Sequence, residues 1–329
     1  MRVLVVTNMY PSDAHPTAGT FVAAQVESLR DAGVDMEVLL IDRVAAGRGV
    51  YRKLAKTVRA SFNTVNPDLV HVMYGGVMSA VVRRTIRERP VLVSFCGADL
   101  LGNPGGAIEI LSAQVGVVAS KWAAVRAAGI VVKSENLFNA LPRGIDGSRV
   151  WILPNGVDLR RFRPLDRLEC QRRLGWDPSR KHVLFPSSPA RTDKRFGLAE
   201  ACVARLNQSG AKVDLHVLED VPHEEVPWWL NAASAILLTS VSEGSPNAVK
   251  EALACNVPVV SVDVGDVRAR IGGIDGCFIA DPTPEDLAGK LGHVFERKGP
   301  IDARSQMDEI SLDHVAGKLR EVYGTLTRP

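Results

Sequence analysis

Residues 235–262 read AILLTSVSEGSPNAVKEALACNVPVVSV, and the order of apolar and helix-forming segments in this stretch decides the fold class. Two continuous apolar runs, Ala235–Leu238 and Val257–Val262, enclose a segment from Pro246 to Ala254 whose apolar spacing predicts a helix. Strands that are apolar at every position are typical of parallel sheets that helices cover on both faces. The stretch therefore predicts a strand–helix–strand unit of an α/β protein.

The same alternation of short apolar runs and helical patterns extends along the chain. Further strands are predicted at Val3–Val6, Glu37–Ile41, Leu69–Val72, Val91–Phe95, Ile130–Val132, Val183–Phe185 and Val213–Val217. Further helices are predicted at Thr20–Ala32, Val50–Phe62, Val77–Arg87, Phe196–Asn207, Glu224–Asn231, Pro284–Phe295 and Ser311–Thr325. Because the strands are continuous Val, Ile and Leu runs, the whole protein is expected to be α/β.

The alternation pauses at Leu153–Asp158, where the sequence LPNGVD combines Pro, Asn and Gly and indicates a turn. We place a linker there, because 329 residues suit two domains of about 150 residues better than one core. The predicted architecture is two doubly wound, Rossmann-like parallel-sheet domains that face a central cleft. They comprise residues 1–160 and 161–310. Residues 311–329 form a C-terminal helix, for which packing against the first domain is one option.

The composition is that of a soluble globular protein, with 46% hydrophobic and 23% charged residues. The five cysteines are scattered and include no C-x-x-C pair, so we expect reduced thiols of a cytoplasmic protein and neither a disulfide framework nor a zinc site. No apolar run approaches 18 residues, so no transmembrane helix is predicted. Met1–Val6 is apolar but is followed by Thr7, which favours a first strand over a signal peptide.

Signature motifs of several enzyme classes are absent from the sequence. No G-x-G-x-x-G follows the first predicted strand, which argues against a nicotinamide-dependent dehydrogenase. The sequence also contains no G-x-x-x-x-G-K phosphate loop and no G-x-S-x-G hydrolase elbow. An ATPase or a serine hydrolase is therefore not indicated.

The start of the predicted helix at residue 246 is a candidate anion site. Ser245 is expected to be the N-cap and Pro246 the first helical residue, where the missing N–H of proline has no cost. The free N–H groups of Asn247 and Ala248 would then point out of the helix start. Together with the helix dipole, they suit an anion such as a phosphate.

Two glutamates lie on either side of this helix start. Glu243 precedes the helix, whereas Glu251 lies within it, on the face shared with Asn247 and Ala248. Carboxylates accept hydrogen bonds from paired hydroxyl groups, so a ribose and a sugar ring are suitable ligands. The alternative is that both glutamates are solvated surface acids.

Two cations follow another predicted strand. Arg191 and Lys194 come after Val183–Phe185 and a short loop that contains Ser188. A nucleoside diphosphate leaving group gains negative charge as the bond to the sugar breaks, and each well-placed donor can stabilise that charge by about 3 kcal/mol. Arginine offers two-point contact and lysine a point charge, so we assign both to donor binding and catalysis.

Three motifs resemble those of family 4 retaining glycosyltransferases, and the resemblance covers nearly the whole chain. Glu243 and Glu251, followed by Pro258–Val260, resemble the E-x7-E signature of that family. Leu153–Asp158, with a phenylalanine four residues later, resembles its interdomain motif. The segment Pro189–Phe196, of sequence PARTDKRF, lies where the family keeps an arginine and a lysine for the donor diphosphate.

The resemblance implies a GT-B fold and a hexosyl transfer with retention, from a UDP-sugar or alternatively a GDP-sugar. An acceptor in cell-envelope or exopolysaccharide synthesis is the implied context. Glu251 would bind the donor ribose, and Glu243 would lie beside the donor sugar as a catalytic residue. Ser188, Ser245, Asn247 and Ala248 would complete the donor site. No D-x-D motif occurs, so neither a metal nor another cofactor is expected.

The first predicted domain resembles the family less closely. Gly19 ends a long loop after the first strand, where the family keeps a Gly-rich loop near the diphosphate, so Gly19 is assigned to donor binding. Ser94–Asp99 resembles the family's HG-D turn, with Cys96 in place of the histidine. Cys96, Asp99 and His71 are therefore assigned to a sugar or acceptor pocket. For His71 a purely structural role stays open.

Two other functions remain open at this level. A nucleotide-sugar epimerase could use the same helix start for phosphate, but no evident acid–base pair supports one. A non-catalytic nucleotide-sugar-binding scaffold is the second alternative. The unusual residues at Cys96 and at Ser245–Asn247 keep the scaffold alternative open.

Charge is distributed unevenly along the chain. Residues 1–160 carry 18 Lys and Arg against 13 Asp and Glu, a balance of +5, whereas the remainder carries 22 against 24, a balance of −2. Arg43–Arg59 contains six cations and no acid: Arg43, Arg48, Arg52, Lys53, Lys56 and Arg59. Val50, Leu54, Ala55 and Val58 form a packing stripe at helical spacing. The basic face predicts peripheral docking on the inner membrane face, which would bring a lipid-linked or acidic glycan acceptor, with an ordinary solvated helix as the alternative. No nucleic-acid partner is predicted.

Overall fold

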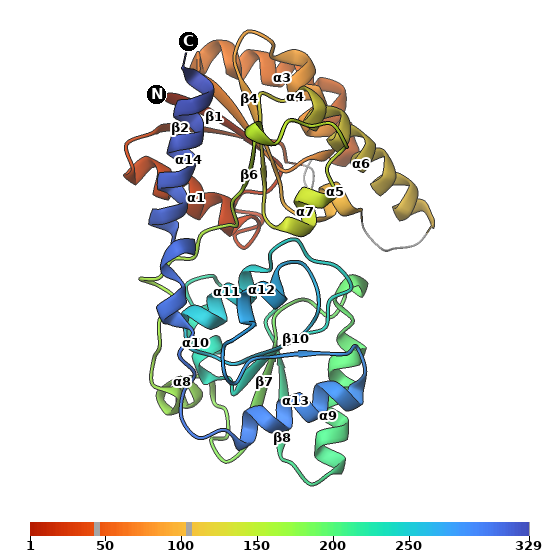
Figure 1. The fold of residues 1–329 in the computed structure, drawn as a ribbon, viewed down its shortest axis with the longest axis vertical. Coiled ribbons are helices and arrows are strands. Elements are labelled where there is room, and N and C mark those ends of the chain that lie inside the picture. Colours follow the sequence, from red (N-terminus) through yellow and green to blue (C-terminus); the bar gives the residue numbers. More distant parts are fainter. Residues whose placement is uncertain (43–46, 103–106, 329) are drawn as a thin grey trace. The chain divides into compact units, whose positions relative to one another are not determined.

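The computed structural model describes residues 1–42, 47–102 and 107–328, without the side chains of residues 48 and 107–112. The chain divides into two compact units, each described here by itself. The first unit combines Met1–Gly156 with Leu312–Pro329, and the second is Val157–Ser311 (Figure 1).

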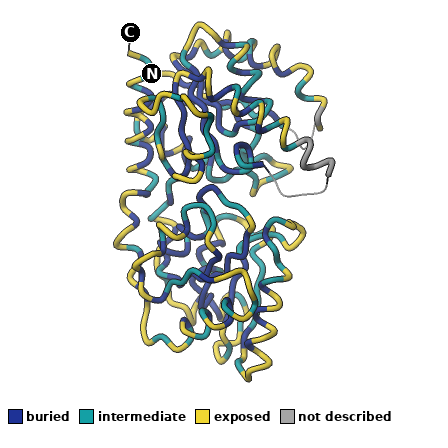
Figure 2. The backbone as a smooth tube through the Cα atoms, turned by 45° about the vertical axis from the view of Figure 1, so that its right-hand side comes forward, coloured by how far each residue is buried: buried dark blue, intermediate teal, exposed yellow. Residues whose placement is uncertain are grey.

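The first unit is built on a parallel sheet with the strand order β2-β1-β3-β4-β5-β6. Its strands are β1 (Arg2–Thr7), β2 (Asp35–Leu40), β3 (Leu69–Met73), β4 (Val91–Phe95), β5 (Gly129–Val132) and β6 (Val150–Ile152). Every residue of β3, β4 and β5 is buried, and the sheet appears as a dark-blue core in Figure 2. The parallel arrangement follows from this two-sided burial.

Helices cover both faces of this sheet. They are α1 (Thr20–Asp31), α3 (Val50–Val65), α4 (Gly76–Thr85), α5 (Ala98–Leu101), α6 (Ala107–Arg126), α7 (Glu135–Asn139) and α14 (Leu312–Thr327). Alternate residues of β1 face opposite layers, as the two-residue period of a strand requires. Val3 and Val5 pack with Leu319 and Tyr323 of α14, whereas Leu4 packs in the opposite layer, with α3 and α4. The C-terminal helix is therefore part of the core of the first unit.

The second unit has a five-stranded parallel sheet in the order β11-β10-β9-β7-β8. Its strands are β7 (Lys181–Phe185), β8 (Val213–Val217), β9 (Ala235–Leu238), β10 (Val259–Val262) and β11 (Phe278–Ala280). Its helices are α8 (Arg167–Leu174), α9 (Phe196–Gln208), α10 (Val226–Ala232), α11 (Asn247–Ala254), α12 (Val267–Ile271) and α13 (Pro284–Glu296). Each strand connects to the next through a helix, which is the arrangement expected of a doubly wound sheet.

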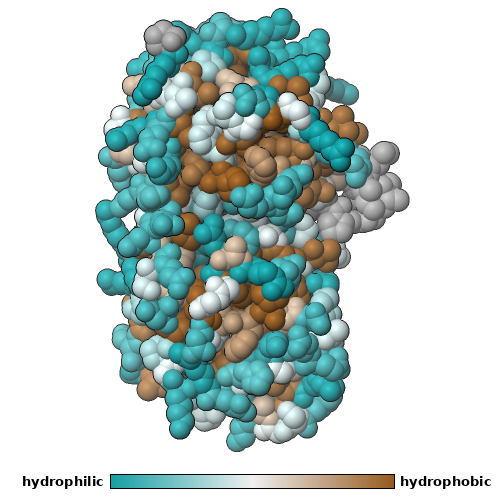
Figure 3. Space-filling model, viewed as in Figure 1, coloured by the Kyte–Doolittle hydropathy of each residue, from teal (hydrophilic) through white to brown (hydrophobic). Residues whose placement is uncertain are grey.

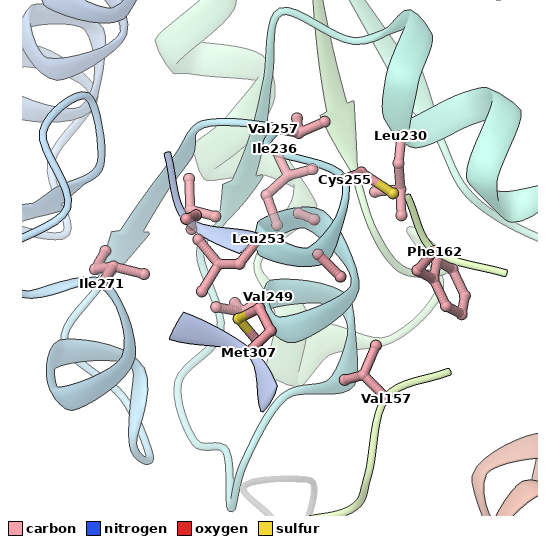
Figure 4. Close-up of a cluster of buried hydrophobic side chains, with 14 of the residues drawn as sticks. Val157, Phe162, Leu230, Ile236, Val249, Leu253, Cys255, Val257, Ile271 and Met307 are labelled. Atoms are coloured by element: carbon pink, nitrogen blue, oxygen red, sulfur yellow. The ribbon is translucent and has the colours of Figure 1, made fainter. Parts of the chain in front are cut away.

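One of the two apolar layers of the second unit holds α11 against the sheet. Val249 and Leu253 of α11 pack in the same buried cluster as Ile236 of β9 and Phe162 (Figure 4). Arg304 adds hydrogen bonds to this packing. Its guanidinium donates to the carbonyl oxygens of three residues in this region: Leu159, Phe162 and Ala254. The start of the second unit and the end of α11 are therefore fixed to each other.

The fold class predicted from the sequence is confirmed, since both sheets are parallel and alternate with helices. The prediction missed the strands β6 and β11, the short helices α5, α7, α8 and α12, and the long helix α6. The sequence of α6, AIEILSAQVGVVASKWAAVR, has small and apolar residues on all sides, so it lacks the one-sided stripe by which an amphipathic helix is recognised.

The exposed surface is mixed in character. Hydrophilic side chains cover much of the visible face of each unit, and hydrophobic ones occur in groups between them (Figure 3). Among the helices of the described residues, none combines the length and the apolar character needed to cross a bilayer.

Candidate functional site

The carboxyl edge of the second sheet brings together two loops that are distant in sequence. The loop after β7 leads through a 3₁₀ turn, Thr192–Lys194, into α9, and the loop after β9 leads into α11 (Figure 1). The strands β7 and β9 are hydrogen-bonded neighbours and run parallel. Both loops therefore leave the same edge of the sheet, where open α/β sheets bind their ligands.

A lysine–glutamate pair joins the two loops. The Nζ atom of Lys194 lies 2.5 Å from Oε1 of Glu243, and the hydroxyl group of Ser240 donates to the same oxygen at 2.7 Å. The two side chains are only 10% and 15% exposed. Thr239 donates its hydroxyl hydrogen to the carbonyl oxygen of Lys194, at 2.7 Å, which holds the lysine backbone against the end of β9. Two of the three residues predicted to be catalytic, Lys194 and Glu243, are thus in direct contact.

Arg191 lies in a more open position than Lys194. Its side chain is 55% exposed, and its guanidinium donates to Asp193 at 2.9 Å. Asp193 also lies 3.5 Å from the ammonium of Lys194. Ser188 shapes the loop before these cations, since its hydroxyl oxygen accepts the N–H of Ala190 at 3.2 Å. The loop thus presents two cations, each of which already has an acidic partner.

The predicted cap of α11 is wrong. The helix begins at Asn247, and Pro246 is the N-cap residue with an extended backbone, φ −67° and ψ 120°. The hydroxyl group of Ser245 does not cap the helix but donates to Asp266 at 2.9 Å. Because Pro246 stays extended, the helix starts one residue later than predicted. The amides of Asn247 and Ala248 still belong to the first turn of the helix.

Glu251 is paired with a histidine that the sequence analysis did not identify. Oε1 of Glu251 lies 3.7 Å from Nε2 of His223, and the two side chains are 18% and 23% exposed. The other ring nitrogen, Nδ1, accepts a hydrogen bond from Arg161 at 2.6 Å. Since Nδ1 is an acceptor, a neutral His223 carries its hydrogen on Nε2, facing Glu251. No sequence motif marks His223, which comes from the loop that precedes α10.

The predicted face of α11 agrees with the observed burial. Glu251, Asn247 and Ala248 are each partly exposed, whereas Val249 and Leu253 are buried. The glutamate and the first amides therefore share the side of the helix that is turned away from the core.

In the first unit, Asp99 organises the loops that follow β3 and β4. Its carboxylate accepts the backbone N–H groups of Gly75, Cys96 and Gly97, at 2.7, 3.0 and 2.8 Å. The side chain is buried, and burial raises the pKa of Asp99 while the backbone hydrogen bonds act in the opposite direction. The structure thus gives Asp99 a role in loop geometry, and its assignment to a sugar or acceptor pocket stays a prediction.

His71, also assigned to a sugar or acceptor pocket, is a core residue. Its ring is fully buried, and its two nitrogens lie 2.7 Å from the hydroxyl groups of Tyr323 and Ser94. Burial lowers the pKa of His71 to about 3, with a further contribution from the nearby Lys133. With both nitrogens engaged inside the first unit, neither is left for a sugar, and the structural alternative for His71 is the correct one.

A buried lysine lies beside Cys96. Lys133 follows β5 and is 1% exposed, and burial lowers its pKa, while the nearby Cys96 and Asp99 raise it. Cys96 itself is only partly buried. Lys133 was not identified from the sequence, because the residues after β4 and β5 become neighbours only when the two strands pair.

Gly19 is required for a close backbone contact. It has φ +65° at the N-cap of α1, and a Cβ atom there would lie 2.3 Å from the carbonyl carbon of Met9. Only glycine fits this conformation and this separation without strain. The packing of the loop explains Gly19, and its assigned role in donor binding stays a prediction.

Sequence comparisons relate the chain to glycosyltransferases. Residues 196–297 match the family model described as "Glycosyl transferases group 1". The whole chain is 26% identical, over 99% of the relative's length, to a protein of Bacillus subtilis (strain 168) assigned as a teichuronic acid biosynthesis glycosyltransferase, TuaC.

Solved structures show the same fold. Sucrose-phosphate synthase from Thermosynechococcus elongatus matches with a TM-score of 0.79 at 16% identity, over 99% of both chains. Anabaena Alr3699/HepE in complex with UDP-glucose matches with a TM-score of 0.69 at 15% identity, over 99% of this chain and 100% of that one. The chain is therefore similar in sequence over its whole length to a glycosyltransferase, and its two parallel-sheet units have the GT-B fold.

Proposed function

We propose that the protein is a retaining glycosyltransferase that transfers a hexosyl group from a nucleotide diphosphate sugar to an acceptor. The observation that carries this proposal is the contact between Lys194 and Glu243, 2.5 Å apart at the carboxyl edge of the second sheet. The match of residues 196–297 to a glycosyltransferase family includes Glu243 and supports a transferase.

Lys194 and Arg191 are the proposed cations for the donor diphosphate. The Lys194 ammonium is held between Glu243 and Asp193, so its position is fixed before any ligand arrives. A fixed cation stabilises charge that develops in the transition state more effectively than a mobile one, because it needs no reorganisation. Arg191 is exposed and can add a second, two-point contact.

The two glutamates have separate proposed roles. Glu251 binds the donor ribose, since paired hydroxyl groups can donate to its carboxylate from the exposed side of α11. Glu243 lies beside the donor sugar, where it also orients Lys194. His223 holds Glu251 from the other side and thereby limits the orientations of its carboxylate.

A UDP-sugar is the favoured donor, with a GDP-sugar as the alternative. Support comes from the structural similarity to Alr3699/HepE, which was solved with UDP-glucose. The reaction is proposed to need no divalent metal, because two cations already serve the diphosphate. Loss of activity with EDTA, restored by Mg²⁺ or Mn²⁺, would contradict that part of the proposal.

The acceptor is proposed to be a cell-envelope glycan or its lipid-linked precursor, since the relative TuaC is assigned to teichuronic acid biosynthesis. Membrane docking through the basic segment Arg43–Arg59 is part of this proposal. Arg52, Lys53 and Lys56 are exposed on α3, whereas Arg59 pairs with Glu88. Arg43 lies outside the described residues, and so does the side chain of Arg48.

The packing stripe predicted for the basic helix is only partly right. Leu54 and Val58 are buried and Val50 is half-buried, but Ala55 is exposed. Flotation with anionic liposomes tests the docking. Binding at low salt that disappears when Arg52, Lys53 and Lys56 are changed to glutamate supports it, and binding that survives these changes contradicts it.

Incubation with UDP-glucose or UDP-N-acetylglucosamine tests the reaction class. A transferase releases UDP slowly by transfer to water, and faster when an acceptor is present. An altered sugar still attached to UDP would identify an epimerase instead. Binding of UDP without either product would identify a scaffold. A Glu243→Gln variant, which keeps the size of the side chain, serves as the matched control and should lose UDP release.

A further inference from the structure

We infer that the second unit contains a zinc site on one face of β7 and β8, made by His182, Asp214 and His216. Within the described part of the chain, these three side chains form the one cluster of His, Cys, Asp or Glu with metal-binding geometry, and their ligand atoms lie within 4.8 Å of one another. The site is independent of the proposed transfer reaction.

Strand pairing places the three side chains on one face of the sheet. His182 is directly opposite Asp214 in the parallel pair of β7 and β8. His216 follows Asp214 by two residues, so both point to the same face of β8. His182 precedes the loop that carries Lys194, and it lies three residues before the end of β7, about 10 Å along the strand. His182 and Asp214 therefore lie near the amino ends of their strands, whereas His216 lies one residue before the end of β8.

The nitrogen spacing suits one metal ion. Nδ1 of His182 lies 2.9 Å from Nε2 of His216. Two nitrogens bound to one zinc ion at about 2.0–2.1 Å are about 2.9 Å apart at a right angle and about 3.3 Å apart at the tetrahedral angle. Oδ2 of Asp214 lies 3.9 Å from the same Nδ1, so a small movement of this half-exposed carboxylate completes a three-ligand set.

The surrounding groups already hold the ligands in suitable orientations. Nε2 of His182 lies 2.8 Å from the carbonyl oxygen of Asp177, so its hydrogen is donated there and Nδ1 is the acceptor nitrogen of the ring. Histidines that bind metals commonly donate their second N–H to a carbonyl or carboxylate in this way. The ring of His216 stacks on Trp176, with centroids 3.6 Å apart and planes at 10°. Both imidazoles are therefore fixed before an ion binds.

Without an ion, the two histidines share one hydrogen bond, in which Nε2–H of His216 donates to Nδ1 of His182. A bound zinc ion takes the place of this hydrogen between the two ring nitrogens. The hydrogen of His216 moves to Nδ1, both rings stay neutral, and the two freed lone pairs bind the ion. Two imidazoles, one carboxylate and one water form the tetrahedral set that Zn²⁺ prefers, whereas Mg²⁺ prefers oxygen ligands. Arg180 donates to the same Oδ2 of Asp214 at 2.6 Å, so this oxygen is held beside the histidines and would be shared between the guanidinium and the ion.

Calorimetry on the full chain, produced without a histidine tag and stripped with a chelator, tests the site. We expect one Zn²⁺ per chain and no heat from Mg²⁺. His216→Asn should weaken zinc binding at least about 100-fold, since even changes to groups that support a ligand cost about 10- to 100-fold. His293→Asn, at an exposed histidine of α13, is the matched control and should bind like the unchanged chain.

A second variant and a second measurement distinguish loss of the zinc site from loss of folding. Asp214→Asn removes the carboxylate without disturbing the buried His182, and Zn²⁺ should raise the melting temperature of the unchanged chain more than that of either variant. Co²⁺ should give the visible absorption of a tetrahedral site. The absence of zinc binding, or equal zinc affinity in all variants, would overturn the inference.

Discussion

Because Lys194 and Glu243 form an ion pair, we expect their contributions to the free energy of unfolding to be strongly coupled. At 2.5 Å and an effective dielectric constant of about 20, the charges attract by about 7 kcal/mol before desolvation. Because both side chains are at most 15% exposed, desolvation cancels much of this attraction, and a net coupling of about 1–3 kcal/mol is expected. Asp193, 3.5 Å from Lys194, keeps the lysine from being wholly unpaired in Glu243→Gln.

A double-mutant cycle with Lys194→Met and Glu243→Gln measures this coupling through urea unfolding. The matched control is the pair of Lys318 and Glu321, which lie 3.2 Å apart but are 47% and 70% exposed. Its coupling should be too small to resolve, as for most exposed ion pairs. A coupling at Lys194 and Glu243 no larger than that of the control would refute the reasoning that burial and short distance make this pair strong.

Three further predictions follow from the same structure. Glu251→Gln should weaken UDP binding by about 13- to 160-fold, the equivalent of about 1.5–3 kcal/mol for a charged hydrogen bond, while Glu200→Gln on the exposed face of α9 should not; equal affinities in calorimetry would contradict the ribose role. Arg191→Ala should lower kcat more than it raises the donor KM, because the charge it meets grows in the transition state; a loss confined to KM would indicate ground-state binding alone. His71 has a folded pKa of about 3, below its unfolded value of 6.5, so the unfolded chain binds more protons and stability falls by up to about 1.4 kcal/mol per unit as pH drops from 6.5 towards 3. His71→Asn should flatten this slope in urea unfolding between pH 6.5 and 5, and an unchanged slope would assign the pH dependence to other groups.

Much of the fold could be predicted from the sequence, because most of its strands are buried on both faces and are therefore mainly apolar. Three predicted strands, Val91–Phe95, Val213–Val217 and Ala235–Leu238, match the observed bounds residue for residue. The segments that the sequence analysis missed lack a distinct apolar pattern. In α6 apolar residues occupy every side of the helix, and β6 and β11 are only three residues long.

Only those features of the candidate site that lie within a single helix could be predicted from the sequence. The shared face of Glu251 and the first amides of α11 follows from helical spacing, which the sequence contains. The contact of Lys194 with Glu243 joins residues 49 positions apart and depends on β7 and β9 being neighbours, which the sequence does not specify. His223 meets Glu251 for a similar reason, through the packing of separate segments.

Transfer of a sugar with retention from a nucleotide diphosphate donor is the central claim, and one measurement tests it most directly. Purified protein is incubated with UDP-glucose and an extract of cell-envelope glycans, and the new linkage is examined by proton NMR. The account predicts UDP release together with an α-linked product, as in the donor, and loss of both in Glu243→Gln. A β-linked product, or turnover that is unaffected by this substitution, would contradict the account.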